Sequence, residues 1–102
     1  MITFLMNEVD GHLNVKLEGD LDIDATEIIN EKISIMEKYK AVNINFASVP
    51  FVDSSGIGLL VHLVQSMDEK GVKITISDVR EDVMAVFELL QIPEIIGKDV
   101  IV

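Results

Sequence analysis

Extended and helical segments alternate along this 102-residue chain, and their order leaves few possible folds. Residues 2–9 and 12–18 are predicted to be extended, and the Asp10-Gly11 dipeptide between them readily supplies the positive φ angles of a tight hairpin turn. Residues 41–46 lie between two helical patterns and residues 72–77 alternate in polarity, so both are predicted to be strands. The chain is therefore expected to begin with a β-hairpin and to continue with two further strands.

The spacing of apolar residues predicts three helices. The first begins at Asp24, which together with Glu27 resembles a capping box, and it extends to Lys40. The second covers residues 54–70, and Gly71 is placed to end it in a left-handed conformation.

The third helix is expected to be capped by Asp78 together with Glu81, and Pro93 is expected to end it. Residues 100–102 are apolar and could add a last edge strand. This order predicts an α/β fold whose mixed β-sheet, an N-terminal hairpin plus parallel strands, is covered by helices on at least one face. The length suits one domain, covering residues 1–102.

The charge of the chain excludes several classes of function. It holds 8 basic and 18 acidic residues, which give a net charge of -10. Proteins that bind nucleic acid need clustered Lys and Arg, so we expect no nucleic-acid partner. The absence of Cys removes disulfides, thiol catalysis and thiolate metal sites. The sequence shows neither a signal peptide nor an apolar run near the ~20 residues of a membrane helix, so a cytoplasmic protein without a membrane partner is expected.

Small polar residues cluster where the second helix is expected to begin, since residues 51–58 read Phe-Val-Asp-Ser-Ser-Gly-Ile-Gly. Asp53 or Ser54 can accept hydrogen bonds from the free N–H groups of the first turn, and Gly56 would allow another backbone to approach closely. Each of the two glycines weakens the helix by up to ~1 kcal/mol relative to Ala, so something other than stability is expected to retain them. A serine here is also a candidate for phosphorylation, because the helix dipole favours an added anion while Asp53 opposes it.

The sequence resembles the STAS domains, and within them the anti-sigma factor antagonists of bacterial partner-switching systems. The resemblance covers nearly the whole chain and rests on the order of elements, on the segment 53–58 after the strand 42–46, and on Gly19-Asp20-Leu21-Asp22 before the first helix. It implies the STAS fold and a binding module rather than an enzyme. In that family an anti-sigma factor that is also an ATP-dependent serine kinase phosphorylates the first serine after the aspartate, which here is Ser54, with Ser55 as the alternative.

The resemblance also implies a switch in partner binding. The unmodified antagonist binds the anti-sigma factor and frees the sigma factor, the phosphorylated form dissociates, and a phosphatase is expected to reset the switch. The residues expected to bind the partner are Asp22, Asp53, Ser54, Ser55, Gly56, Ile57, Gly58 and Leu59. The alternative within the fold is an adaptor domain of a transporter or of a stressosome-like assembly, with no sigma factor as partner.

A calcium site is a rival interpretation of the acidic run before the first helix. Asp20, Asp22, Asp24 and Glu31 match the ligand spacing of an EF-hand loop. Ala25 stands at the sixth position, however, where that loop needs Gly for its sharp turn. Helix capping is the preferred interpretation, and we expect no metal and no cofactor.

A hydrolase is the other rival, since it could use a serine of the 51–58 segment. Such an enzyme needs a base, and neither His12 nor His62 stands at an obvious triad position. Leu59 and Leu63 lie off the predicted buried stripe of the second helix, so they belong either to the core or to a partner-binding patch.

Overall fold

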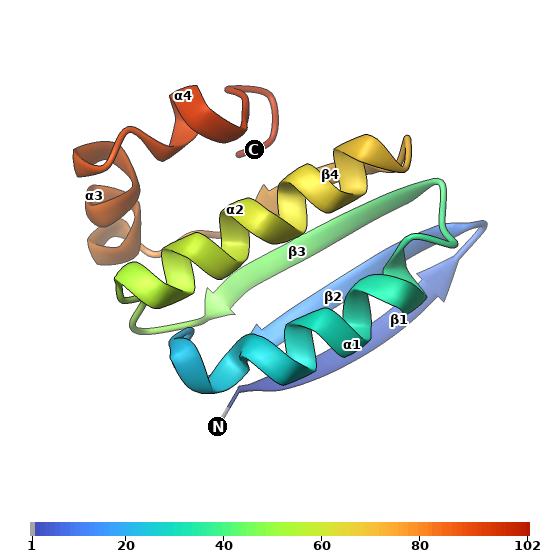
Figure 1. The fold of residues 1–102 in the computed structure, drawn as a ribbon, viewed down its shortest axis with the longest axis horizontal. Coiled ribbons are helices and arrows are strands. Elements are labelled where there is room, and N and C mark those ends of the chain that lie inside the picture. The colour runs from blue at the N-terminus through green and yellow to red at the C-terminus, as the bar shows by residue number, and fades with distance from the viewer. Residues whose placement is uncertain (1) are drawn as a thin grey trace.

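The predicted mixed sheet is confirmed in the computed structural model, which describes residues 2–102. The sheet has the strand order β1-β2-β3-β4, with β1 antiparallel to β2 and the other neighbours parallel (Figure 1). The elements are β1 (Thr3–Val9), β2 (His12–Glu18), a 3-10 turn η1 (Ile23–Ala25), α1 (Thr26–Met36), β3 (Ala41–Ser48), α2 (Ser54–Glu69), β4 (Lys73–Ser77), α3 (Glu81–Leu89) and α4 (Ile92–Ile96).

The two faces of the sheet differ in polarity because successive side chains of a strand point to opposite sides. Helices α1 and α2 lie across one face (Figure 1), and the apolar residues of β2 and β3 that point to it are buried. The opposite face carries Asn43 and Asn45 of β3. The amide of Asn43 donates to the hydroxyl of Thr75 at 2.8 Å and accepts from that of Ser77 at 3.0 Å. These asparagines therefore fit a central strand because they lie on its polar face.

The start and end of the first helix differ from the prediction. Asp24 does not cap it: Asp22 caps η1 instead, its Oδ1 accepting from the N–H of Asp24 at 3.0 Å, and α1 begins only at Thr26. The helix ends at Met36 rather than Lys40. The backbone of Lys40 is used elsewhere, because its N–H donates to Gly11 at 3.2 Å and its C=O accepts from Lys73 at 3.1 Å. Tertiary pairing thus overrides the helical pattern at the C-terminal end, whereas at the N-terminal end the local cap of η1 by Asp22 replaces the predicted one.

The cap predicted for the third helix is also wrong. The Asp78 carboxylate accepts a hydrogen bond from the amide of Asn45 at 2.7 Å, and its backbone adopts a φ of 56°. Helix α3 then begins at Glu81 and ends at Leu89, before Pro93. Pro93 lies instead in the first turn of α4, where its missing N–H removes no helical hydrogen bond.

The end of the second helix agrees with its prediction, and the C-terminal tail agrees in part. Gly71 adopts a φ of 74°, which confirms the left-handed termination after α2. The tail forms a single parallel bridge between Ile76 and Ile101 rather than a full strand. Ile76 donates to the carbonyl of Val100 at 2.7 Å and accepts from Val102 at 2.9 Å, so the tail covers part of the β4 edge.

Candidate functional site

The N-terminus of α2 is capped by Asp53 and not by Ser54. Asp53 is extended, its Oδ1 accepts from the N–H of Gly56 at 2.8 Å, and its carbonyl accepts from Ile57 at 2.9 Å. Ser54 is therefore the first helical residue, and its hydroxyl is not needed to begin the helix.

The loop after β2 lies against the loop after β3. Gly19 donates to the carbonyl of Ser48 at 3.0 Å, Leu21 donates to that of Phe51 at 3.0 Å, and Leu21 forms a parallel bridge with Val52. Asp53 in turn donates to the carbonyl of Leu21 at 3.3 Å. The two segments that the resemblance singled out, 19–22 and 53–58, are thus held together by backbone hydrogen bonds at the carboxyl ends of parallel strands, where such folds place their binding sites.

Gly56 packs directly against the backbone of this neighbouring loop. A Cβ atom added at Gly56 would stand 1.9 Å from the carbonyl oxygen of Leu21 and 2.6 Å from its carbonyl carbon. The expectation that this glycine permits a close backbone approach is confirmed, and packing alone accounts for it.

Gly58 has no such packing reason. A Cβ added there would meet no atom within 4 Å, and the residue is exposed one turn beyond Ser54. The structure therefore gives no stability reason for this glycine, which costs a helix up to ~1 kcal/mol relative to Ala.

The residues expected to bind a partner divide between surface and interior. Ser54 and Gly58 are exposed, while Asp22, Asp53, Ser55 and Leu59 are half-buried. Gly56 and Ile57 are buried. These two residues shape the site from within, so only the other members of the set can meet another molecule.

Two exposed apolar side chains border this site and were missed in the sequence. Ile23 follows Asp22 in η1 and is 66% exposed, and Phe51 precedes the α2 cap and is 53% exposed. Phe51 and Val52 also line a hollow of about 230 Å³ against Val83 and neighbouring residues of α3. The available signal was the position of Ile23 and Phe51, since each lies in one of the two loops that contain the segments 19–22 and 53–58 or lead into them.

Leu59 and Leu63, which the sequence assigned either to the core or to a partner-binding patch, differ in burial. Leu63 is buried in the core, whereas Leu59 is half-buried and packs against the core from its margin, and His62 is exposed. Leu63 therefore belongs to the core and cannot form part of a partner-binding patch.

The structure also bears on the two rival interpretations, a hydrolase that uses a serine near Ser54 and a calcium site. His12 begins β2 and pairs with Ala41 at the start of β3, so it lies at the end of the sheet opposite to the α2 N-terminus. Within residues 2–102 no group of three or more His, Asp or Glu side chains is arranged to hold a metal ion. None of the helices in that range is both long and apolar enough to span a membrane.

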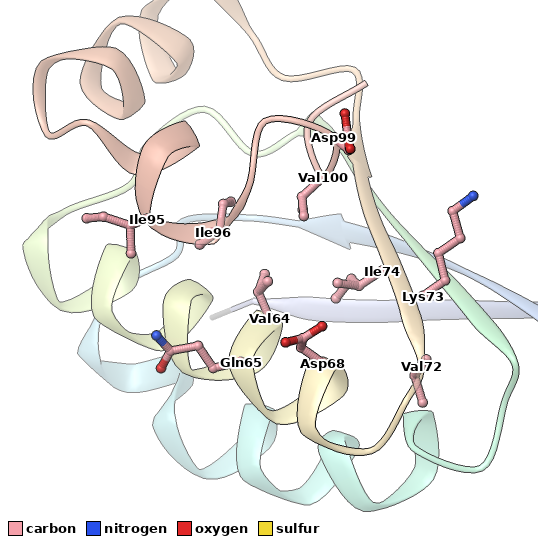
Figure 2. A pocket seen from close by; sticks show the side chains of 10 residues that line it. All are labelled: Val64, Gln65, Asp68, Val72, Lys73, Ile74, Ile95, Ile96, Asp99 and Val100. Atoms are coloured by element: carbon pink, nitrogen blue, oxygen red, sulfur yellow. The ribbon is translucent and has the colours of Figure 1, made fainter.

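A separate pocket of about 430 Å³ lies at the far end of α2 (Figure 2). Its apolar lining includes Val64, Ile74 and Ile96, and Asp68 and Asp99 stand among its polar residues. Asp68 follows Ser54 by 14 positions on α2, about 21 Å along the axis at 1.5 Å per residue. This pocket is therefore not part of the site at the α2 N-terminus.

Comparisons with known proteins identify relatives by sequence and by structure. The anti-sigma-B factor antagonist of Staphylococcus epidermidis is 28% identical over 82 residues, which cover 78% of this chain and 76% of that protein. The structure of the Bacillus cell fate determinant SpoIIAA in its phosphorylated form is 23% identical, with a TM-score of 0.71, over 98% of this chain and 89% of that one.

The same fold occurs in a protein named for another role. The sulfate transporter family protein from Wolinella succinogenes is 16% identical, with a TM-score of 0.81, over 93% of this chain and 79% of that one. At such identities a structural likeness establishes the fold alone. The model of one family, described as the STAS domain, matches residues 3–101. The chain therefore belongs to the STAS domain family.

Proposed function

We propose that this protein is an anti-sigma factor antagonist whose partner binding is switched off by phosphorylation of Ser54. The unmodified protein binds an anti-sigma factor that has serine kinase activity and thereby releases a sigma factor in the cytoplasm. A phosphatase restores the binding form. The observation that carries the proposal is the placement of an exposed serine at the α2 N-terminus, beside the loop of residues 19–22.

Exposure and capping favour Ser54 over Ser55 as the phosphorylated residue. Ser54 is exposed, whereas Ser55 is half-buried, and a kinase needs access to the hydroxyl. Because Asp53 supplies the helix cap, modification of Ser54 leaves the hydrogen bonds that begin α2 in place. Phosphorylation can therefore change the surface without unfolding the site.

The charge around Ser54 explains why a phosphate would oppose binding. The phosphoryl group adds about -1.5 to -2 charges at neutral pH. Asp53 adjoins it in sequence, and neither residues 19–24 nor residues 51–59 contain Lys or Arg to pair with it. No basic side chain of these two segments therefore pairs with the added anion, and desolvating it in an interface would cost more than desolvating the hydroxyl.

The exposed apolar residues Ile23 and Phe51 supply the hydrophobic part of this binding surface. Large apolar side chains that become fully buried are the usual centres of binding energy in an interface. We expect Ile23→Ala or Phe51→Ala to weaken binding to the anti-sigma factor by about 2 kcal/mol, or ~30-fold, with little change in stability. Isothermal titration calorimetry measures the affinity, and urea denaturation the stability.

Leu89→Ala is the matched control for these two substitutions. Leu89 is 82% exposed and lies at the end of α3, and it is not among the residues that line the hollow beside Phe51. Its truncation should leave affinity unchanged. Equal losses in all three variants would contradict a binding surface centred on the α2 N-terminus.

A STAS adaptor of a transporter or of a stressosome-like assembly is the second candidate, and the Wolinella succinogenes likeness favours it. The antagonist is preferred because the relative detected by sequence is named an anti-sigma-B factor antagonist, and its alignment covers 78% of this chain. A pull-down with each anti-sigma kinase of the producing organism, in the presence of ADP, separates the two. Retention by one kinase supports the antagonist, and retention by none would favour the adaptor.

A further inference from the structure

Strand β1 forms an open edge of the sheet. Among residues 2–102 it pairs only with β2, whereas the tail from Val100 to Val102 covers part of the opposite edge at β4. Alternate residues of an edge strand point their backbone N–H and C=O groups outward, where they can pair with another strand. The β1 edge offers these groups over seven residues, Thr3–Val9.

Apart from the charged side chain of Glu8, the residues of β1 lack the features that usually prevent edge-to-edge pairing. Such edges are commonly interrupted by Lys, Pro or a β-bulge. Strand β1 contains neither residue, and its register with β2 is continuous from Thr3 opposite Glu18 to Val9 opposite His12. Glu8 is its single charged residue, although the whole chain carries a net charge of -10. Leu5 and Val9 are 48% and 53% exposed.

We propose that β1 pairs antiparallel with β1 of a second copy of this chain, across a two-fold axis perpendicular to the sheet. Such an axis centred on Met6 places Thr3 opposite Val9 and Leu5 opposite Asn7. This register uses every residue of the strand, and the four-stranded sheets join into one continuous sheet with both helical layers on the same side.

The charges and side chains of β1 favour a second copy in this register. Glu8 of each copy lies opposite Phe4 of the other, so no like charges face each other directly. On the face opposite to the helices, the two Leu5 side chains are diagonal neighbours around the axis, and Val9 faces Thr3. The pairing therefore places neutral residues beside both exposed apolar side chains of the strand.

The proposed dimer leaves the α2 N-terminus of each copy accessible. Thr3 pairs with Glu18, next to the loop of residues 19–22, so this end of β1 marks the end of the sheet that carries Ser54. Antiparallel pairing then places the two serine sites at opposite ends of the joined sheet. The inference does not depend on the proposed function, and its test needs no partner protein.

Light scattering after size-exclusion chromatography tests the proposal across a range of protein concentrations. We expect a species of twice the 11.3 kDa chain mass for the natural sequence. Leu5→Lys should shift it to the monomer, because the new ammonium groups of the two copies would be diagonal neighbours around the axis and would repel each other. Ala47→Lys, on an exposed position of β3 away from this edge, should remain dimeric.

Cross-linking identifies the paired edge directly, because the chain contains no Cys. A short bis-maleimide should join Leu5→Cys into a covalent dimer and should leave Ala47→Cys monomeric on a denaturing gel. A monomer at every concentration would overturn the proposal. So would a dimer of Leu5→Lys, or equal cross-linking of the two cysteine variants, because either result would place the contact elsewhere.

Discussion

Gly56→Ala is expected to destabilise the protein by about 3 kcal/mol or more, the upper range for overpacking a close-packed site. The new Cβ would stand 1.9 Å from the carbonyl oxygen of Leu21, where no atom can be accommodated. Neither backbone can withdraw freely, because Leu21 pairs with Phe51 and Asp53, and Gly56 donates to the cap. Urea denaturation followed by circular dichroism measures the change in the free energy of unfolding.

Gly58→Ala is the matched control, since it makes the same substitution two positions along the same helix. Its Cβ would meet no atom within 4 Å, so the higher helix propensity of Ala should raise stability by about 0.5–1 kcal/mol. Opposite signs for the two variants would confirm that only Gly56 is required by packing. Similar effects in both would contradict the close approach of Leu21 to α2.

Ser54→Glu is expected to weaken binding to the anti-sigma factor by more than a hundredfold, because a cost of ~3 kcal/mol in the interface suffices. The introduced carboxylate lies beside Asp53 and has no basic partner in residues 19–24 or 51–59. Ser54→Ala should bind like the natural protein but should not respond to the kinase and ATP. Isothermal titration calorimetry distinguishes the two variants.

The stability of these variants provides the control for their binding. Asp53 caps α2, so neither substitution at Ser54 removes a cap, and both variants should unfold within about 0.5 kcal/mol of the natural protein. Weak binding by a fully folded Ser54→Glu would therefore reflect the surface charge. Equal affinity of the two variants would mean that Ser54 has no part in the switch.

The sheet and the second helix could be predicted because their signals are local. The Asp10-Gly11 turn sets the hairpin, with φ angles of 52° and 80°, and apolar spacing sets α2 and the Gly71 termination. Each of these features depends on residues close together in the chain.

Two of the failed predictions share a physical cause, which is competition from distant residues, whereas the Asp24 cap fails locally because Asp22 accepts its N–H. Asp78 was expected to cap α3, but its carboxylate is taken by Asn45, 33 positions away. The first helix stops short of Lys40 because the backbone of that residue pairs with Gly11 and Lys73. A capping motif reports what a side chain can do locally and not which distant partner competes for it.

The candidate site could be predicted only in part. The 53–58 segment located it, and Gly56 was expected to allow a close backbone approach, but the sequence could not identify Leu21 as the neighbour. The apolar border formed by Ile23 and Phe51 was missed because exposure of an apolar loop residue depends on the packing around it.

Phosphorylation of the natural protein by the anti-sigma kinase proposed as its partner, followed by an affinity measurement, tests whether Ser54 is the switch. The protein would be incubated with ATP and the kinase that retains it in ADP, the modified residue mapped by mass spectrometry, and the purified phosphoprotein titrated into the same kinase. We predict one phosphate, on Ser54, and an affinity lower by more than a hundredfold. A phosphate on another residue, or an unchanged affinity of the Ser54 phosphoprotein, would contradict it.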